Sequence, residues 1–367
     1  MNEKETFLFM ADGHVRGRTW TNSMVLQGDA YAALGRLAEL SAYTGTIVIG
    51  GDWFDSNRPS SRDVDVTVAC LSRFARAYYI KGNHDNADPA WLGGIVPSAR
   101  HLTEVPEELH PGVYICGQDW MASREESLAG LRRIAANAAG LSSCHRLYVV
   151  LHDAIQELLG YDGTYLCSAG ELAEIFSAAA AEKVDFLVGH VHVSRSLLLN
   201  DRMQLFSPGC MYPDAVDRMQ ASCGALLFGQ RGDSAEDMPL DVRAYVRVDY
   251  TDDDSLRAAC RGAVEQSLDA HLPLPPAVLV NVADENTTVK TRDYPDVAMM
   301  VVRNGQPSDR PEETRSLATQ AESMLQAIQE AASYDSTIRD MAVALYECDD
   351  PLAEIDKWLT HWGAVRA

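Results

Sequence analysis

Five short polar motifs follow one another along the first two hundred residues of the sequence, and each comes directly after an apolar run. Runs of this kind, rich in Val, Ile, Leu and aromatic residues, are typical of buried strands. In open α/β sheets, functional side chains gather at the carboxyl ends of the strands, so residues distant in sequence meet at one edge. We therefore expect the motifs to converge on one site. They are Asp12-Gly-His14, Gly51-Asp52-Trp-Phe-Asp55, Gly82-Asn83-His84-Asp85, His152 and Gly189-His190-Val-His192.

Helical segments separate these strands. Ser168 followed by Glu171 predicts a capping box at the start of one such helix. The alternation of strands and helices predicts an α/β fold for this part of the chain. Apolar residues recur at helical spacing in 29–43, 62–77, 124–139 and 168–182.

The chain beyond residue 230 has a different pattern. The polar stretch 230–239 predicts a boundary after a first domain at 1–232. A second break at 305–311 precedes the segment 311–367, which is expected to be helical. Between the breaks, a small α+β unit is predicted at 240–305, with strands at 242–250, 277–283 and 297–303 and a helix at 253–268.

The composition limits the class of protein. Hydrophobic residues make up 47% of the chain and charged residues 23%, as in a globular protein, and no apolar run is long enough to span a membrane. The start of the chain does not have the pattern of a secretory signal. The eight cysteines form no Cys-x-x-Cys pair, so reduced thiols in a cytoplasmic protein are expected.

The formal net charge of −22 weakens a nucleic-acid function, because nucleic-acid binders usually carry a basic surface. It does not exclude one, since bound divalent cations would cancel part of the acidic charge near the motifs. Several arginines also lie beside the motifs in sequence, where they are either substrate-binding residues or ordinary surface residues. These are Arg16, Arg18, Arg58 and Arg62.

The motif side chains offer oxygen and imidazole nitrogen atoms that bind divalent cations. The carboxylate of Asp52 can bridge two cations, and Asn83 offers a neutral carbonyl oxygen. This mixture suits Mn²⁺, Fe²⁺ or Zn²⁺ better than Mg²⁺ or Ca²⁺. We expect two ions, with Mn²⁺ first among the three, and a two-metal site indicates in-line displacement at phosphorus. The expected ligands are Asp12, His14, Asp52, Asn83, His152, His190 and His192.

The ordered motifs resemble the signature of calcineurin-like metallophosphoesterases over about residues 6–210. The resemblance implies a two-sheet α/β sandwich and a metal-dependent phosphoesterase activity. It implies that His84 touches the scissile phosphate and helps the leaving oxygen depart, with Asp85 orienting His84. It also implies a first metal on Asp12, His14 and His192, a second on Asn83, His152 and His190, and Asp52 as the bridge.

Two segments, 51–60 and 184–192, look like those of SbcD-type DNA double-strand-break repair nucleases, which include phage recombination nucleases. Some relatives carry a histidine at the place of Asp55, so the balance between exonuclease and endonuclease action stays open. The segment 205–210 resembles the one that follows the last motif in this family, except that Cys210 stands where the family usually has a serine. The resemblance implies that the 240–305 unit is a cap that contacts DNA and that the C-terminal helical segment binds an SbcC-type, SMC-like ATPase. The expected partners are DNA, this ATPase and a second copy of the chain, with no membrane.

One apolar stripe stands out in the segment 350–362. Asp350 can cap a helix there, with Pro351 at its first position, and two tryptophans four residues apart make good interface anchors. The stripe either binds the ATPase partner or packs on its own domain, and the first is expected. Its members are Leu352, Ile355, Trp358, Leu359 and Trp362.

Two other functions compete with a DNA nuclease. A stand-alone metallophosphodiesterase acting on small phosphoesters or cyclic nucleotides would share the metal site and need neither cap nor partner helix. A non-catalytic scaffold would show degenerate ligands, whereas every ligand position of the motifs is filled.

The stripe generates a direct prediction. Replacing Trp358 and Trp362 by Ala should abolish binding of the SbcC-type ATPase and leave intrinsic phosphodiesterase activity intact, because the tryptophans would serve only the interface. Binding is measured by analytical ultracentrifugation and folding by circular dichroism. Loss of folding in the variant would instead assign the stripe to the core.

Overall fold

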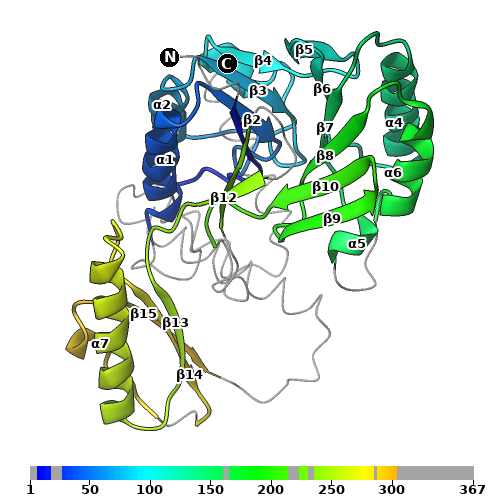
Figure 1. The fold of residues 1–367 in the computed structure, drawn as a ribbon. Helices are drawn as coiled ribbons and strands as arrows, with labels where there is room; N and C mark the ends of the chain where they lie inside the picture. The colour runs from blue at the N-terminus through cyan, green and yellow to red at the C-terminus, as the bar shows by residue number, and fades with distance from the viewer. Residues whose placement is uncertain are drawn as a thin grey trace, which may run out of the picture. The chain divides into compact units, whose positions relative to one another are not determined.

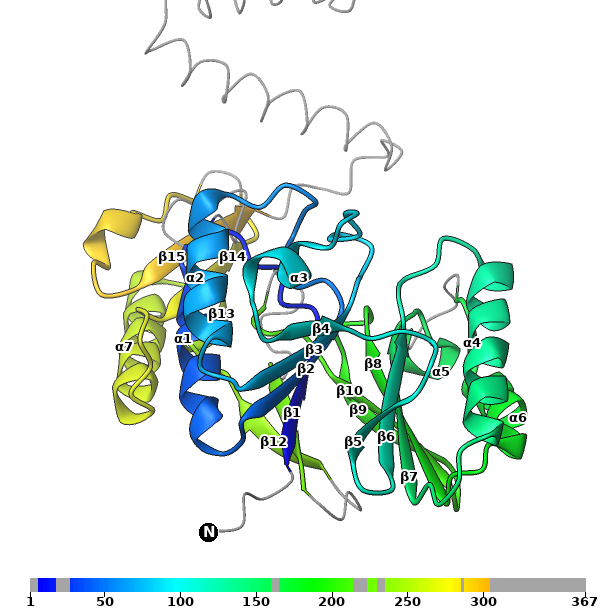
Figure 2. The same cartoon turned by 90° about the horizontal axis from the view of Figure 1, so that it is seen from above.

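The computed structural model describes residues 6–17, 27–159, 165–213, 223–229, 235–284 and 287–303. These residues form two six-stranded sheets and one three-stranded sheet. The two large sheets pack face to face, and helices cover the outer face of each, as Figure 1 and Figure 2 show. The predicted two-sheet α/β sandwich is therefore confirmed.

The first sheet has the order β12-β11-β1-β2-β3-β4. β1 to β4 run parallel to one another; at one side β11 pairs antiparallel with β1, and β12 pairs antiparallel with β11. Its strands are β1 (Phe7–Met10), β2 (Thr46–Gly50), β3 (Arg76–Ile80), β4 (Ala99–His101), β11 (Gly224–Phe228) and β12 (Ala235–Pro239). Its helices are α1 (Asp29–Glu39), α2 (Ser61–Leu71) and α3 (Trp91–Ile95), and the 3₁₀ turn η1 (Leu40–Ala42) follows α1.

The second sheet has the order β5-β6-β7-β8-β10-β9, with β6, β7, β8 and β10 parallel. Its strands are β5 (Glu107–His110), β6 (Val113–Gln118), β7 (Arg146–His152), β8 (Lys183–Gly189), β9 (Ser194–Asn200) and β10 (Met203–Pro208). Its helices are α4 (Arg124–Ala139), α5 (Gln156–Leu159) and α6 (Ala169–Ile175), and η2 (Phe176–Ala178) follows α6.

Alternation along the strands builds the layers of the sandwich. In β1, Phe7 and Phe9 belong to the core between the two sheets, whereas Leu8 and Met10 belong to the core beneath α1 and α2. Fully burying such side chains stabilises a fold by about 1.5–3 kcal/mol each. Contacts of β2 with β7 and β8 show that the two sheets meet along their central parallel strands.

Most predicted helices agree with the structure. The helix at 124–139 has the predicted bounds, and the capping box of Ser168 and Glu171 is present at the start of α6. The helix predicted at 62–77 was too long. α2 ends at Leu71, because the following aromatic and β-branched residues form β3.

The stretch 230–239 was predicted to be a domain boundary, yet its second half forms β12. This strand pairs with β11 at the edge of the first sheet. Pro239 is tolerated at its end because an edge position does not require an N–H donor.

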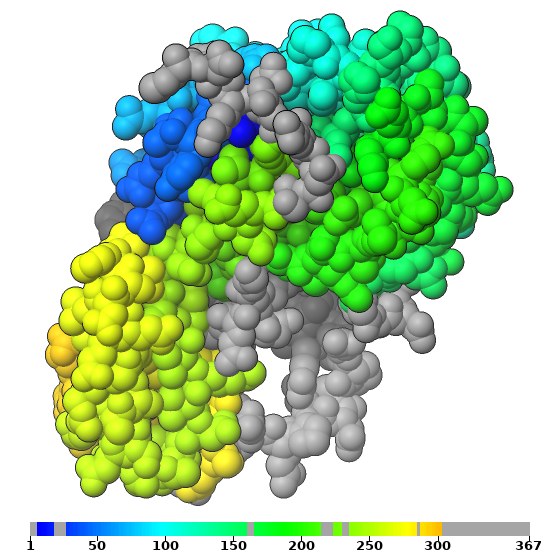
Figure 3. Space-filling model, in the orientation of Figure 1, coloured from blue at the N-terminus to red at the C-terminus, as the bar shows by residue number. Residues whose placement is uncertain are grey.

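The predicted small unit is present as three strands and one long helix. All three strands run parallel, in the order β13-β14-β15. Figure 3 shows α7 in yellow at the surface of the molecule. The elements are β13 (Tyr245–Asp249), α7 (Asp253–Asp269), β14 (Ala277–Val282), η4 (Thr291–Asp293) and β15 (Ala298–Arg303).

The predicted helical segment 311–367, with its stripe of apolar residues, lies outside the described residues. Among the helices that are described, none combines the length and apolarity needed to cross a membrane.

A buried ion pair joins the small unit to α1. The guanidinium of Arg243 donates to both carboxylate oxygens of Asp29, at 2.7 and 3.0 Å, and Tyr245 Oη donates to the same carboxylate at 2.6 Å. Arg243 also donates to the carbonyl oxygen of Gln27. A buried charge pair stabilises a fold when its geometry is good and its hydrogen bonds are filled, and both conditions hold here.

Replacing Asp29 by Ala should lower the free energy of unfolding by about 3–5 kcal/mol, because the guanidinium of Arg243 would remain buried without a counter-charge. Tyr245→Phe removes one hydrogen bond from the same carboxylate and should cost about 1 kcal/mol. Asp269→Ala, at an exposed position of α7, is the control and should change stability by less than about 0.5 kcal/mol. Urea unfolding measures all three, and an Asp29→Ala effect no larger than that of the control would contradict the assignment.

Candidate metal centre

The seven predicted ligands all lie at the carboxyl ends of parallel strands. They come from the two large sheets, which is why residues 180 positions apart, such as Asp12 and His192, can meet. β1, β2 and β3 lead into the first three motifs, and β8 into the last. His152 is itself the final residue of β7. The fold thus delivers both carboxylates and imidazoles to one edge, as the sequence predicted.

The first predicted metal set is brought together. Donor atoms of Asp12, His14 and His192 lie within 4.8 Å of one another. Nε2 of His14 is 3.0 Å from Nε2 of His192, which in turn is 3.2 Å from Oδ1 of Asp12. Two imidazole nitrogens facing each other this closely, beside a carboxylate oxygen, are suited to share one cation.

The second set gathers on the neighbouring strands. Nδ1 of His190 lies 3.1 Å from the amide oxygen of Asn83. His190, His152 and Asp52 also form a group whose donor atoms lie within 4.8 Å of one another. On the other side of its ring, His152 Nδ1 lies 2.7 Å from the carbonyl oxygen of Gly50, so Nε2 is the nitrogen directed to the site.

Asp52 lies between the two sets, as a bridging ligand requires. Its Oδ2 is 3.2 Å from Nε2 of His152 and 3.8 Å from Nε2 of His14. Its Oδ1 accepts the backbone N–H of His84 at 2.8 Å. The carboxylate is therefore fixed in place while one oxygen faces both groups of imidazoles.

Unusual backbone geometry marks these ligands. Positive φ angles occur at Asp12 (53°), His14 (38°), Asp52 (49°), His190 (86°) and His192 (57°). This region costs a non-glycine residue about 1–3 kcal/mol, and such residues cluster at functional sites.

Gly82 is needed for its small size. A Cβ at that position would lie 2.0 Å from Oδ1 of Asp52, so only glycine leaves room for the bridging carboxylate.

The donor set fits two divalent cations. Nε2 of His152 is buried and makes no aligned hydrogen bond within the described structure, although Asp52 Oδ2 is near. A buried imidazole nitrogen that lies near carboxylates without an aligned hydrogen bond is expected of a metal ligand. Two carboxylates, one amide and four imidazoles are side chains that bind divalent cations.

The protonation of the ligands follows from their surroundings. Burial opposes the charge on His152, but the close approach and negative charge of the Asp52 carboxylate outweigh it and raise the pKa of His152 to about 9. Burial, reinforced by the charge on His152, lowers the pKa of His190 to about 4. Burial alone would raise the pKa of both Asp12 and Asp52, but the neighbouring imidazoles hold these values below the usual range.

His84 has the exposure expected of a residue that meets substrate. Its side chain is 43% exposed, whereas that of His152 is 0% exposed. Its backbone N–H binds Asp52, and Nδ1 of its ring lies 3.1 Å from the carbonyl oxygen of Asp55. His84 is therefore fixed beside the bridging carboxylate and open to a ligand.

Asp85 does not orient His84 as predicted. Its Oδ1 accepts the N–H of Gly82, and its Oδ2 accepts those of Trp53 and Phe54. Burial, reinforced by the nearby charge of Asp52, raises the pKa of Asp85. Asp85 therefore joins the second and third motif loops. Asp55 is the residue beside the His84 ring, with its carbonyl oxygen 3.1 Å and its Oδ1 4.0 Å from Nδ1 of His84.

The predicted substrate arginines are placed differently from one another. Arg16 is partly buried and donates to Oδ2 of Asp55 at 2.7 Å. Arg58 and Arg62 are exposed, on the second motif loop and in the first turn of α2. Arg18 lies outside the described residues.

Tyr212 was not predicted from the sequence, yet its side chain holds the backbone of the first motif by a hydrogen bond. Its hydroxyl donates to the carbonyl oxygen of His14 at 2.6 Å, and the N–H of Met211 donates to the carbonyl oxygen of Asp12 at 3.3 Å. The only sequence signal was the position of this segment directly after β10, at the same sheet edge as the motifs.

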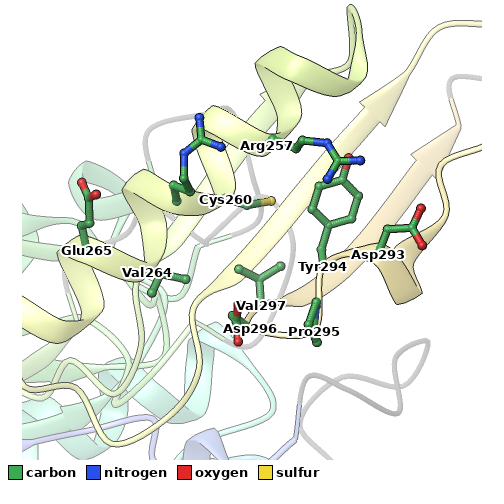
Figure 4. A pocket seen from close by; sticks show the side chains of 10 residues that line it. Arg257, Cys260, Val264, Glu265, Asp293, Tyr294, Pro295, Asp296 and Val297 are labelled. Atoms are coloured by element: carbon green, nitrogen blue, oxygen red, sulfur yellow. The ribbon is translucent and has the colours of Figure 1, made fainter.

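A separate hollow of about 300 Å³ lies between α7 and the 293–297 segment (Figure 4). The guanidinium of Arg257 lies 5.6 Å from the centre of the Tyr294 ring there. No predicted ligand lines this hollow, so it is distinct from the candidate metal centre.

Comparisons with known proteins give structural similarities only. No family model matches the sequence, and no curated protein matches it. A dimetal phosphatase from Danio rerio is 14% identical, with 64% of this chain and 96% of that chain covered and a TM-score of 0.44. A 5'-nucleotidase from Candida albicans is 10% identical, with 57% and 47% covered and a TM-score of 0.36. A metallophosphoesterase from Sphaerobacter thermophilus is 12% identical, with 73% and 95% covered and a TM-score of 0.31.

Metal binding should release a proton from His152. Its pKa in the metal-free protein is raised from 6.5 to about 9, so the ring is protonated at neutral pH and must lose that proton to bind a cation. The apparent affinity for Mn²⁺ should therefore rise as the pH approaches about 9. The raised pKa also stabilises the metal-free protein, fully below pH 6.5 and no longer once the pH has passed about 9.

Calorimetric titration with Mn²⁺ in two buffers of different ionisation enthalpy measures the release, which should be about one proton per chain near neutral pH. Heats that are identical in the two buffers, together with a pH-independent affinity, would contradict the assignment.

Proposed function

We propose that the protein is a two-metal phosphodiesterase of the calcineurin-like type that cleaves DNA, as an SbcD-type nuclease subunit working with an SMC-like ATPase. The observation that carries the phosphodiesterase part is the position of Asp52 between two groups of metal ligands, with the exposed His84 held against it. The motif order supports the same function independently.

The chemistry follows from these positions. Two bound cations would polarise the phosphoryl oxygens and lower the pKa of water so that it can attack phosphorus. His84 is placed to hold a proton at its ring and donate it to the leaving oxygen, the role of a general acid. Its backbone hydrogen bond to Asp52 fixes its distance from the site, and its exposure lets a substrate reach it.

The second and third motif loops form a surface beside the site that would suit a polymeric substrate such as DNA. The side-chain amide of Asn57 donates to Asn86, and the indole N–H of Trp91 donates to the carbonyl of Asn57. These bonds join the second and third motif loops into one surface, on which Arg58 is exposed. Arginines of this kind bind phosphates without reading sequence. DNA binding by this chain alone should then be weak and salt-sensitive, given its net charge of −22.

The partner and the cap belong to the proposal as well. The unit at 242–303 has the size and position in the chain of a DNA-contacting cap, and the Asp29–Arg243 pair would keep it attached to the catalytic part. The helical stripe that ends at Trp362 is proposed to bind the ATPase.

One assay tests the substrate class. Linear duplex DNA, single-stranded DNA and a small chromogenic diester are each incubated with the protein and Mn²⁺. Cutting of either DNA supports the proposal. Turnover of the small diester with no cutting of DNA would favour a stand-alone phosphodiesterase, and inactivity on all three would contradict a phosphodiesterase.

Replacing His84 by Ala should lower turnover by about 10²–10⁴-fold, the usual contribution of a general acid. Both metals should remain bound, because His84 is not among the proposed ligands. His101→Ala is the matched control, since His101 is also a partly exposed histidine but pairs with Asp119 instead of the metal ligands. Metal content is measured by elemental analysis, and loss of metal in His84→Ala would refute the role given to His84.

A further inference from the structure

Asp55 occupies a special position in the second motif. The two residues before it, Trp53 and Phe54, are fully buried, and their N–H groups are held by Asp85. Asp55 is the first residue of the loop to emerge from this anchor, and its side chain is 27% exposed. The backbone just before Asp55 is therefore fixed in place, which sets the position of the Asp55 side chain.

Three functional side chains surround Asp55. Its Oδ1 lies 3.3 Å from Nδ1 of His14, and its Oδ2 accepts Nη1 of Arg16 at 2.7 Å. Its carbonyl oxygen lies 3.1 Å from Nδ1 of His84. Asp55 thus contacts three residues: His14, a predicted ligand of the first metal; His84, the predicted general acid; and the positively charged Arg16.

The orientation of His14 decides which nitrogen can bind metal. Nε2 of its ring faces His192, Asp52 and hence the predicted metal. Nδ1 must then carry the proton, because a neutral imidazole has one donor and one acceptor. In the described structure this Nδ1 is buried without an aligned hydrogen bond, and Oδ1 of Asp55 is the carboxylate oxygen beside it.

A third cation on Asp55 is disfavoured. Donor atoms of His14, Asp55 and His84 lie close enough to hold an ion. The guanidinium of Arg16 is already bound to the Asp55 carboxylate, however, and a metal ion bound to the same carboxylate would be repelled by it. Arg16 thus supplies the positive charge at this position.

We propose that Asp55 is a positioning residue, which selects the Nδ1-protonated form of His14 for the first metal while Arg16 holds the Asp55 carboxylate in place. The inference rests on the two-metal part of the proposed function and does not depend on the substrate. Carboxylate partners of metal-bound histidines typically change metal affinity by about 10–100-fold.

Mn²⁺ binding by the full chain tests this directly, with calorimetry and electron paramagnetic resonance as readouts. Asp55→Ala should weaken one of the two binding events by about 10–100-fold and leave the other unchanged. Asp55→Asn should recover most of the loss, because its amide oxygen can still accept the N–H of His14. Asp119→Ala is the matched control, as Asp119 is similarly exposed and pairs with His101 and Lys81, which are not ligands.

A double-mutant cycle separates positioning from a merely structural role. In a His14→Ala background, Asp55→Ala should cause no further loss of Mn²⁺ affinity, whereas in a His152→Ala background its full effect should persist. Equal losses in both backgrounds, or an unchanged affinity in Asp55→Ala alone, would overturn the inference and leave the two-metal site standing. Failure of the unmodified protein to bind Mn²⁺ would instead overturn the proposed function.

Discussion

The whole site depends on holding the backbones of several predicted ligands in the left-handed region, at the carboxyl ends of strands from both large sheets. Asp12, His14, Asp52, His190 and His192 all have positive φ angles. Each such conformation costs about 1–3 kcal/mol, so the surrounding structure must impose it. Buried strands precede each of these loops, and the core between the sheets fixes where the strands end. Tyr212 adds a direct support by binding the carbonyl of His14. The large buried core between the two sheets therefore holds the predicted ligands close together despite their unfavourable backbone conformations.

Three aspartates of the motif loops show how burial and neighbours divide roles among identical side chains. Asp52 faces imidazoles and keeps its charge, as a bridging ligand requires. Asp85 is also buried, but within the described residues it accepts only backbone N–H groups, and it serves to join two loops. Asp55 is partly exposed and paired with Arg16. The three side chains are chemically identical, and only their surroundings distinguish the proposed metal ligand Asp52 and the proposed positioning residue Asp55 from Asp85, which joins two loops.

Much of the fold and of the ligand set could be predicted from the sequence. Buried strands such as 46–50 have a clear apolar pattern, and the ligand-bearing motifs stand directly behind them, so the convergence follows from parallel-sheet geometry. The partners of Asp85 and Asp55 could not be predicted, because both choices depend on how two loops pack against each other. β12 was missed since its sequence is polar, and only pairing with β11 makes it a strand. Tyr212 contacts His14 across nearly two hundred residues and leaves no local signal.

The central claim is that Asp52 bridges two cations held by this strained edge. Electron paramagnetic resonance of the protein titrated with Mn²⁺ tests it most directly, because ions about 3.5–4 Å apart couple magnetically. The account predicts two Mn²⁺ per chain with a spin-coupled signal, which Asp52→Asn would abolish. Isolated Mn²⁺ signals at full loading, or no binding by the unmodified chain, would contradict it.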